Sequence, residues 1–354
     1  MEIMGCNTKN ETLRLNRRDL LKLGGAAAAA GALGLQSGAA SGAASAPAAS
    51  APVAGPGHVV KVHMKGMRGG LFPDPAASRK MVDKAVSALT GESDPGRAWL
   101  KFVAPSDRVL IKVNCLGTRM LSTMKEVTFA VADAIREAGV PDANILVLDM
   151  FASNMMGGRY DQQPAANKMR VLAHKEGSYD KAWIEAGPAK ARFSDLLLWS
   201  TAVINVPPIK DHDLAGVTCT LKNMTFGTVE KPHLNHPVVN ETCAHLFAHE
   251  IIRSRVRLNI IDGSRVLYDG GPKFAGSAHV LHECIYATCD PVAMDAVAFE
   301  MIETLRAENG MRTLADVGRP AKFLQMAADL GLGIADRKKI HLETVEMPPL
   351  AAAT

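Results

Sequence analysis

The residues best suited to chemistry lie between positions 204 and 227, where lysine, histidine, threonine and asparagine side chains are concentrated. Thr218, Thr220 and Lys222 alternate in this stretch, so in an extended segment they would share one face. Two hydroxyls and an ammonium group on one face suit a carboxylate or a phosphate. The stretch therefore predicts a site for a small anion, in which Lys222 has a catalytic role. The expected ligand-binding residues within it are Lys210, Thr218, Thr220 and Asn223.

Polar residues also follow several apolar runs that have the pattern of buried strands. Asn114 follows VLIKV, Asp149 follows NILVL, and Asp262 follows LNII. In open α/β sheets, ligands bind outside the carboxyl ends of the strands. We therefore expect one shared cleft, in which Asn114 binds the ligand and Asp262 is catalytic, both orienting a substrate or a metal. The alternative is that Asp and Asn only end strands and cap helices.

His212 stands between two carboxylates, Asp211 and Asp213, shortly after the run VINVPP. A neighbouring carboxylate can raise the pKa of an imidazole and orient its ring. The spacing favours His212 as a catalytic acid or base, or as a metal ligand. A solvated polar loop is the alternative.

A second set of candidate metal ligands is His245 and His249, which are four positions apart and follow Cys243. On a helix, residues at this spacing share a face, as two imidazole ligands of one metal would. The stretch lacks the glutamate of the HExxH motif. A helix with one partly buried and one exposed histidine is therefore the alternative. The cofactor stays open, with a divalent metal as one candidate.

The elements around these residues follow an α/β pattern. Residues 108–114 and 144–149 are typical of buried strands, and residues 123–138 between them are typical of an amphipathic helix that ends at Gly139. This order forms a βαβ unit, which favours a parallel sheet. We expect a mainly parallel sheet with helices on both faces and a lid or insertion around 151–195. Further expected strands are 59–63, 201–206, 258–262, 284–289 and 339–345, and further expected helices are 78–89, 241–253, 291–305 and 321–330.

The N-terminal segment is typical of a twin-arginine export signal. Arg17 and Arg18 precede an apolar run at 23–35 and then small residues that suit cleavage. The run is shorter than the roughly 20 residues of a membrane-spanning helix, so we expect no membrane span in the mature chain. Passage through the twin-arginine (Tat) translocase predicts a periplasmic or otherwise extracytoplasmic location. The expected organisation is a signal peptide at 1–43, a tether at 44–57 and a single α/β domain at 58–346.

Composition and missing motifs argue against several classes of protein. The formal charge is +4, and residues 1–43 contribute +2 of it through five basic and three acidic side chains. The mature chain is thus close to neutral, and no nucleic acid partner is expected. The sequence has no GxGxxG, no P-loop and no GxSxG, which disfavours nucleotide binding by a known motif and the common serine hydrolases. Six cysteines without a CxxC give no local support for an iron–sulfur cluster.

Several motifs taken together resemble one known family. VINVPPIKDH at 203–212 and GVTCTLKNMTFG at 216–227 resemble the domain of unknown function 362, and IKVN, IIDG, GGP and CDPVAMDAVA match its other landmarks in order. The resemblance covers about residues 105–305. It implies an α/β domain and locates the site, but it brings no assigned reaction. Some members carry an added ferredoxin module. This chain lacks those cysteines, so a built-in iron–sulfur cluster is not expected.

Two functions remain open from the sequence. The first is an exported enzyme that acts on a small carboxylate or phosphate ligand at the carboxyl edge of the sheet, with metal assistance as an option. The second is a non-catalytic exported protein that binds a metal or a redox cofactor, or accompanies a redox partner. A complete set of metal ligands would favour the second function, and the sequence shows only a partial set.

Overall fold

The computed structural model describes residues 55–175, 178–272 and 278–350, which belong to one structural unit. The expected signal peptide and most of the expected tether lie outside the described residues. None of the helices in the described part of the chain combines the length and apolar character that crossing a membrane requires.

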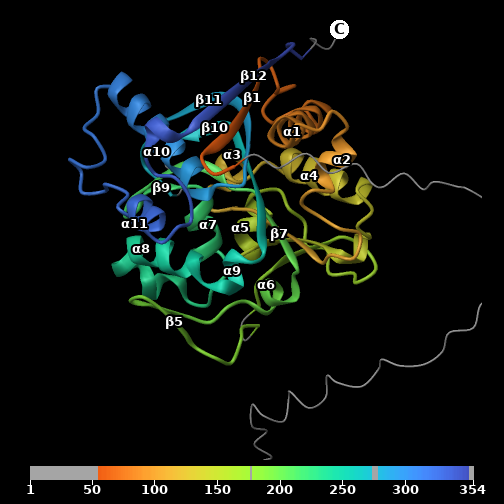
Figure 1. The fold of residues 1–354 in the computed structure, drawn as a ribbon, viewed down its shortest axis with the longest axis horizontal. Helices are drawn as coiled ribbons and strands as arrows, with labels where there is room; N and C mark the ends of the chain where they lie inside the picture. The colour runs from red at the N-terminus through yellow and green to blue at the C-terminus, as the bar shows by residue number, and fades with distance from the viewer. Residues whose placement is uncertain (1–54, 176–177, 273–277, 351–354) are drawn as a thin grey trace, which may run out of the picture. The chain divides into compact units, whose positions relative to one another are not determined.

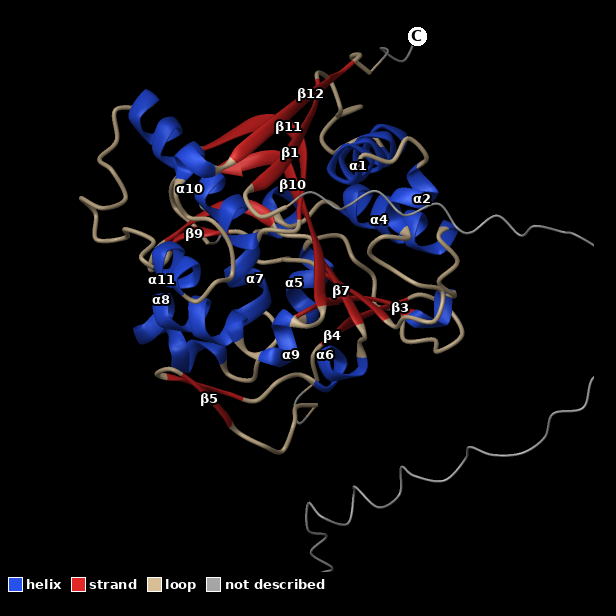
Figure 2. Cartoon of the chain, viewed as in Figure 1, coloured by secondary structure: helices blue, strands red, loops and turns tan. Residues whose placement is uncertain are grey.

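A ten-stranded sheet forms the centre of this unit (Figures 1 and 2). Its strands are β1 (His58–Met64), β2 (Val109–Lys112), β3 (Ile145–Asp149), β4 (Arg170–Ala173), β7 (Ala202–Asn205), β8 (Pro208–His212), β9 (Gly216–Thr218), β10 (Val256–Leu267), β11 (His279–Thr288) and β12 (His341–Met347). The order is β12-β1-β11-β10-β7-β2-β3-β4, and β8 pairs with β10 and β9. Most pairs are parallel, while β11 is antiparallel to both of its neighbours. The predicted mainly parallel sheet is confirmed.

The central strands are buried along their whole length and mostly apolar, because helices cover both faces of the sheet. Every residue of β2, β3 and β7 is buried, as expected for parallel strands between two helical layers. Successive side chains alternate between the faces. Leu110 and Val203 belong to one apolar core, and Ile111 and Ile204 belong to the other.

The helices form two layers, one on each face of the sheet (Figure 1). The core that contains Ile111 is covered by α1 (Pro75–Thr90), α2 (Pro95–Trp99) and α4 (Lys125–Glu137). The core that contains Leu110 is covered by α7 (Thr220–Phe226), α10 (Pro291–Glu308) and α11 (Phe323–Asp329). The prediction of helices on both faces is therefore confirmed.

Local sequence signals determine where the two longest helices begin. The Asp74 carboxylate accepts a hydrogen bond from the Ala77 amide and caps α1. The Asp290 carboxylate accepts a hydrogen bond from the Ala293 amide and caps α10. Pro291 takes the first helical position, where its missing N–H costs nothing.

The segment at 151–195 is only partly the lid or insertion that the sequence predicts. It begins with the short helix α5 (Ala152–Gly157), and its strand β4 then pairs with β3 at the edge of the central sheet. The remainder forms a separate hairpin of β5 (Ile184–Ala186) and β6 (Ala189–Ala191), and α6 (Asp195–Trp199) begins at its end.

The predicted continuous helix at 241–253 is wrong. The chain forms α8 (Val239–Glu241) and a π-helical turn over Thr242–Leu246, and α9 (Glu250–Arg253) starts anew after a break. The break lies at His249, whose backbone is extended (φ −61°, ψ 136°).

The cysteines of the described residues are all free thiols. Cys115, Cys219, Cys243 and Cys284 are buried, and Cys289 is exposed. Cys284 lies within β11, while Cys289 follows its end. The two are unpaired.

Candidate functional site

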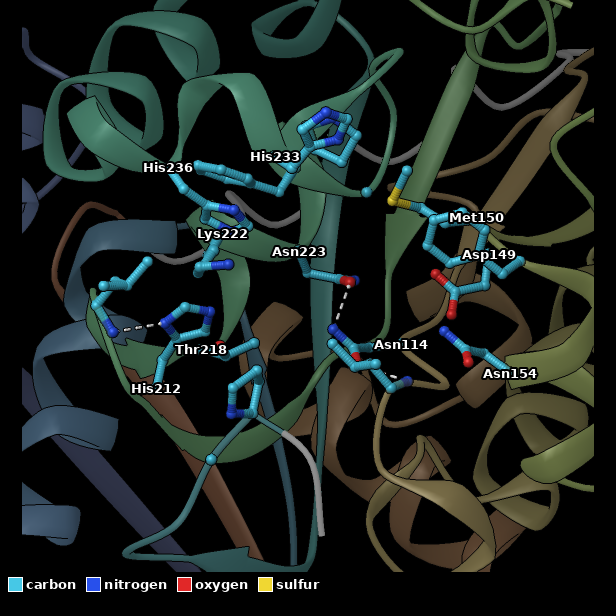
Figure 3. A pocket seen from close by; sticks show the side chains of 18 of the residues that line it. Asn114, Asp149, Met150, Asn154, His212, Thr218, Lys222, Asn223, His233 and His236 are labelled. Atoms are coloured by element: carbon cyan, nitrogen blue, oxygen red, sulfur yellow. Dashed lines mark hydrogen bonds between the residues drawn. The ribbon is translucent and has the colours of Figure 1, made fainter. Parts of the chain in front are cut away.

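A cavity of about 570 Å³ lies at the carboxyl ends of β2 and β3 (Figure 3). One side of it is built by β8, β9, α7 and the turn at 232–238, and the other side follows β2 and β3 and includes α5. The polar lining residues on the first side are His212, Asp213, Thr218, Lys222, Asn223, His233 and His236, and those on the second side are Lys112, Asn114, Asp149 and Asn154.

Lys222 is a buried lysine without a counterion among the residues that the structure describes. Its side chain lies on α7, and the residue is 7% exposed. Its Nζ forms no hydrogen bond or ion pair with any described residue and lies 4.3 Å from the centre of the Phe226 ring. Burial lowers the pKa of Lys222 to about 8, although Cys243 and Asp213 partly offset this effect. A cationic group held this way is stabilised by an anion that enters the cavity.

Thr218 is the second unusual residue of the lining. It ends β9 and is 3% exposed, and its Oγ1 has no hydrogen-bond partner among the described residues. Buried hydroxyls nearly always have a partner. The Thr218 hydroxyl therefore keeps a hydrogen-bonding capacity that no described residue uses.

His212 is a neutral imidazole. Its Nδ1 accepts hydrogen bonds from the Leu214 amide (3.1 Å) and the Ala215 amide (3.2 Å). Burial and then the nearby positive charge of Lys222 lower its pKa to about 2. The Asp213 carboxylate lies 3.0 Å from the same Nδ1, but its side chain is 64% exposed and screened by water. The two amides therefore determine the tautomer, with the ring proton on Nε2.

This geometry corrects the expectation that a neighbouring carboxylate raises the pKa of His212. The Asp211 carboxylate is engaged elsewhere, in an ion pair with Arg319 at 2.8 Å. The ring of His236 also lines the cavity, with its centre 6.0 Å from that of His212. His212 can donate a hydrogen bond from Nε2, but it cannot act as an acid that is charged near neutral pH.

A buried network of amides and lysines joins the two sides of the cavity. The Asn114 Nδ2 donates to the Asn223 Oδ1 at 3.3 Å (Figure 3). The Lys210 Nζ donates to the Asn114 Oδ1 at 2.8 Å, and burial lowers the pKa of Lys210 to about 7. The Asn223 Nδ2 donates to the Asn205 Oδ1 at 2.8 Å. The structure therefore brings Asn114, Lys210 and Asn223 together as the sequence predicts, with Lys210 behind Asn114 rather than in the lining.

Lys112 and Asp149 form an ion pair in the lining, at 2.8 Å. Burial opposes the ionised form of Asp149, but the charge and hydrogen bond of Lys112 prevail and lower its pKa. Gly227 lies beside this pair and cannot be replaced without a shift, because a Cβ at position 227 would lie 2.4 Å from the Asn223 carbonyl oxygen and 2.6 Å from the Lys112 Nζ. The candidate site residues from the sequence did not include Lys112, although a lysine within an apolar strand is a visible signal.

Thr220 does not face the cavity, so the expectation that it shares a face with Thr218 and Lys222 is wrong. Strand β9 ends at Thr218, and α7 begins at Thr220. The Thr220 Oγ1 lies 2.6 Å from the Asp295 Oδ1 and 2.7 Å from the Pro291 carbonyl. Burial raises the pKa of Asp295 to about 6. Thr220 therefore joins α7 to α10.

Asp262 also lies outside the cavity lining. Strand β10 continues through it to Leu267, and its carboxylate accepts hydrogen bonds from the Met124 and Ser264 amides. In the sequence, a glycine directly after Asp262 is typical of a strand end, but Gly263 lies within β10. A Cβ at position 263 would lie 2.9 Å from the Cys284 carbonyl oxygen. Asp262 therefore fixes the start of α4 through the Met124 amide, and it is not one of the residues that line the cavity.

The structure does not bring His245 and His249 together on one helical face. His245 lies in the π-helical turn against Gly187, and the His249 Nδ1 accepts a hydrogen bond from the Ile251 amide as the cap of α9. Across the residues that the structure describes, no three His, Cys, Asp or Glu side chains gather closely enough to hold a metal ion.

Comparison with known proteins identifies the family. The sequence model of the family described as Domain of unknown function (DUF362) matches residues 109–300, which is more than half of the chain. The chain belongs to this family. Every cavity residue named above lies within the matched region of the DUF362 protein. A twin-arginine translocation signal matches residues 14–34, so the protein is exported from the cytoplasm through the Tat translocase.

Two solved structures are similar at a low level. The lactate racemase apoprotein from Thermoanaerobacterium thermosaccharolyticum is 9% identical with a TM-score of 0.36, and the match covers 70% of this chain and 57% of that one. A protein from Thermotoga maritima is 12% identical with a TM-score of 0.40, with coverages of 68% and 60%. This chain thus spans less than two thirds of either. No relative among the curated proteins matches it.

Proposed function

We propose that this exported DUF362 protein is an enzyme that binds a small carboxylate or phosphate compound in the cavity beside Lys222. The observation that carries the proposal is the buried Lys222 ammonium, which has no counterion among the described residues. Burying an unpaired charge costs several kcal/mol. A protein gains that free energy back when a ligand of opposite charge binds, so an anion fits this position.

The neighbours of Lys222 suit an oxyanion. The Thr218 hydroxyl lacks a partner among the described residues, and the Nε2–H of neutral His212 forms no hydrogen bond with any of them. A carboxylate or a phosphate accepts hydrogen bonds and offers several acceptor positions. One ammonium group and two neutral donors therefore match such a group in charge and in hydrogen bonding.

The chemistry that Lys222 supplies is proton transfer to a ligand oxygen. With a pKa of about 8, Lys222 is neutral in about a quarter of the ligand-free protein molecules at pH 7.5. A group with a pKa close to the working pH is the most effective acid or base catalyst. Lys222 can thus stabilise negative charge that develops on an oxygen and then protonate it, while His212 holds that oxygen as a neutral donor.

The test compares two variants that each lose one positive charge. Lys222→Met removes the buried ammonium, and Lys190→Met removes an exposed one that pairs with Glu185 outside the cavity. Calorimetry of the purified exported protein would measure binding of acetate, benzoate, phenyl phosphate and inorganic phosphate. For each anion that binds to the wild-type protein, we expect Lys222→Met to lower the affinity at least tenfold. Lys190→Met should change the same affinity less than twofold.

Equal losses in both variants would show that anions respond to the overall charge of the protein and would refute the site. Failure of all four anions to bind to the wild-type protein would refute the proposed function itself.

A further inference from the structure

Beside its polar residues, the cavity has a largely apolar lining. Its lining includes Leu116, Phe151, Leu214, Phe226 and Pro232. The rings of Phe226 and His236 stack with their centres 5.0 Å apart and their planes 21° from parallel. Burial lowers the pKa of His236, so its ring is mostly neutral near pH 7. The stacked pair is therefore a flat and weakly polar part of the lining.

The volume is far larger than a small anion needs. The cavity measures about 570 Å³. Cavities of about 300–1,000 Å³ typically bury most of a drug-sized molecule. Phosphate or acetate bound at Lys222 would fill only a small part of this space.

Two large apolar side chains of the lining are half exposed. Phe151 is 53% exposed and Leu214 is 47% exposed, although both belong to the cavity. Phe151 precedes α5, and Leu214 lies in the turn between β8 and β9, so they come from opposite sides of the cavity. A ligand with an apolar body would remove both from water, which a small hydrophilic anion cannot do.

The charges indicate a single anionic group on the ligand. Lys112 and Asp149 neutralise each other within the lining, and the Asp213 side chain is 64% exposed. Among the described residues of the lining, Lys222 is the one buried charge without an ion-pair partner. A second charge on the ligand would find no unpaired buried partner of opposite sign among the described lining residues.

We infer that the substrate is an organic acid with one anionic group bound at Lys222 and a large, flat apolar body that lies against Phe226, Leu214 and Phe151. This inference rests on the proposed function, because Lys222 must hold the anion. It goes beyond that function by excluding small hydrophilic anions as the main substrates. Each buried CH₂ group contributes about fourfold to affinity, so affinity should rise steeply with the apolar body.

The test measures binding of acetate, benzoate and 2-naphthoate to the exported protein by calorimetry, with 2-naphthalenemethanol as the uncharged counterpart. We expect affinity to rise at least tenfold from acetate to benzoate and again to 2-naphthoate. Two matched leucine variants accompany the series. Leu214→Ala removes an exposed side chain of the cavity, and Leu281→Ala removes one of similar exposure (55%) on β11, outside it.

Leu214→Ala should weaken 2-naphthoate about fivefold to tenfold and leave acetate unchanged, while Leu281→Ala should change neither. If acetate, benzoate and 2-naphthoate bind equally and all lose affinity in Lys222→Met, the inference fails and the proposed function stands. If 2-naphthalenemethanol binds as tightly as 2-naphthoate, Lys222 does not select an anion and both fail. Equal effects of the two leucine variants would also overturn the inference.

Discussion

Thr218 and Thr220 are buried threonines two positions apart, and their surroundings predict opposite effects when each is changed to valine. Valine keeps the shape of threonine and replaces the hydroxyl with a methyl group. At position 218 the change removes a buried hydroxyl that has no partner among the described residues. Such a group costs about 1–3 kcal/mol. The free energy of unfolding of the ligand-free protein should therefore rise by up to that amount.

At position 220 the same change removes a hydroxyl that lies 2.6 Å from Asp295 and 2.7 Å from the Pro291 carbonyl. A hydrogen bond to a charged group contributes about 1.5–3 kcal/mol. Thr220→Val should therefore lower the free energy of unfolding by about 2 kcal/mol. The two variants serve as controls for each other, because they have the same chemistry and nearly the same burial.

The assay is thermal unfolding of the two purified variants, followed by circular dichroism without added ligand. For a domain of this size, 1 kcal/mol corresponds to about 2 °C in Tm. Thr218→Val should thus unfold about 2–6 °C higher than the wild type, and Thr220→Val about 4 °C lower. Benzoate should stabilise the wild type more than Thr218→Val. A lower Tm for Thr218→Val would refute the reasoning, because it would show that the hydroxyl already supports the fold.

Four further predictions concern charge and export. Affinity for benzoate should fall as the pH rises above about 8, where Lys222 loses its proton, and calorimetry from pH 6 to 10 would show this. Between about pH 8 and 10.5 the unfolded chain holds more protons at Lys222 than the folded protein does. The free energy of unfolding, measured in guanidinium chloride, should therefore rise with pH relative to Lys222→Met, and a falling difference would contradict the lowered pKa. Asp149→Asn should lower the free energy of unfolding by about 3–5 kcal/mol, because it leaves the Lys112 ammonium buried without its partner; an unchanged denaturation midpoint would contradict this. Changing both Arg17 and Arg18 to lysine should keep the protein in the cytoplasm, and its appearance in the extracytoplasmic fraction would argue against the Tat signal.

The βαβ unit of β2, α4 and β3 could be predicted from the sequence because its signals are local. Its strands are continuous apolar runs, and its helix has apolar residues at helical spacing. The position of the cavity followed from the same pattern, since the parallel strands end together. Lys112 and Asp149 were also predictable in principle, because Lys112 pairs in register with Leu148, next to Asp149, once β2 and β3 lie side by side.

The sequence did not predict which residues of 216–227 share a face. The extended pattern ends at Cys219, where the backbone (φ −151°, ψ −121°) redirects the chain from β9 into α7. A seven-residue helix is too short to show a clear period. Thr220 therefore faces Asp295, a residue far away in the sequence, and this contact depends on how α10 packs against α7.

Asp262 shows a different limit of sequence analysis. The dipeptide formed with Gly263 resembles the end of a strand, and such glycines often begin turns. Here the glycine is needed because β10 passes close to the Cys284 carbonyl of β11. A glycine required by close packing and a glycine required by a turn look the same in a sequence.

The free thiols in the described part of this protein are protected when the chain is exported in the folded state. Cys115, Cys219, Cys243 and Cys284 are buried, and burial raises the pKa of each, so they hold little reactive thiolate. If the chain folds before it crosses the membrane, these four thiols are already buried when the protein meets extracellular oxidants. The same chain sent across unfolded would expose them all and could cross-link wrongly before its core formed. Transport in the folded state thus lets a thiol-containing interior persist in an oxidising environment.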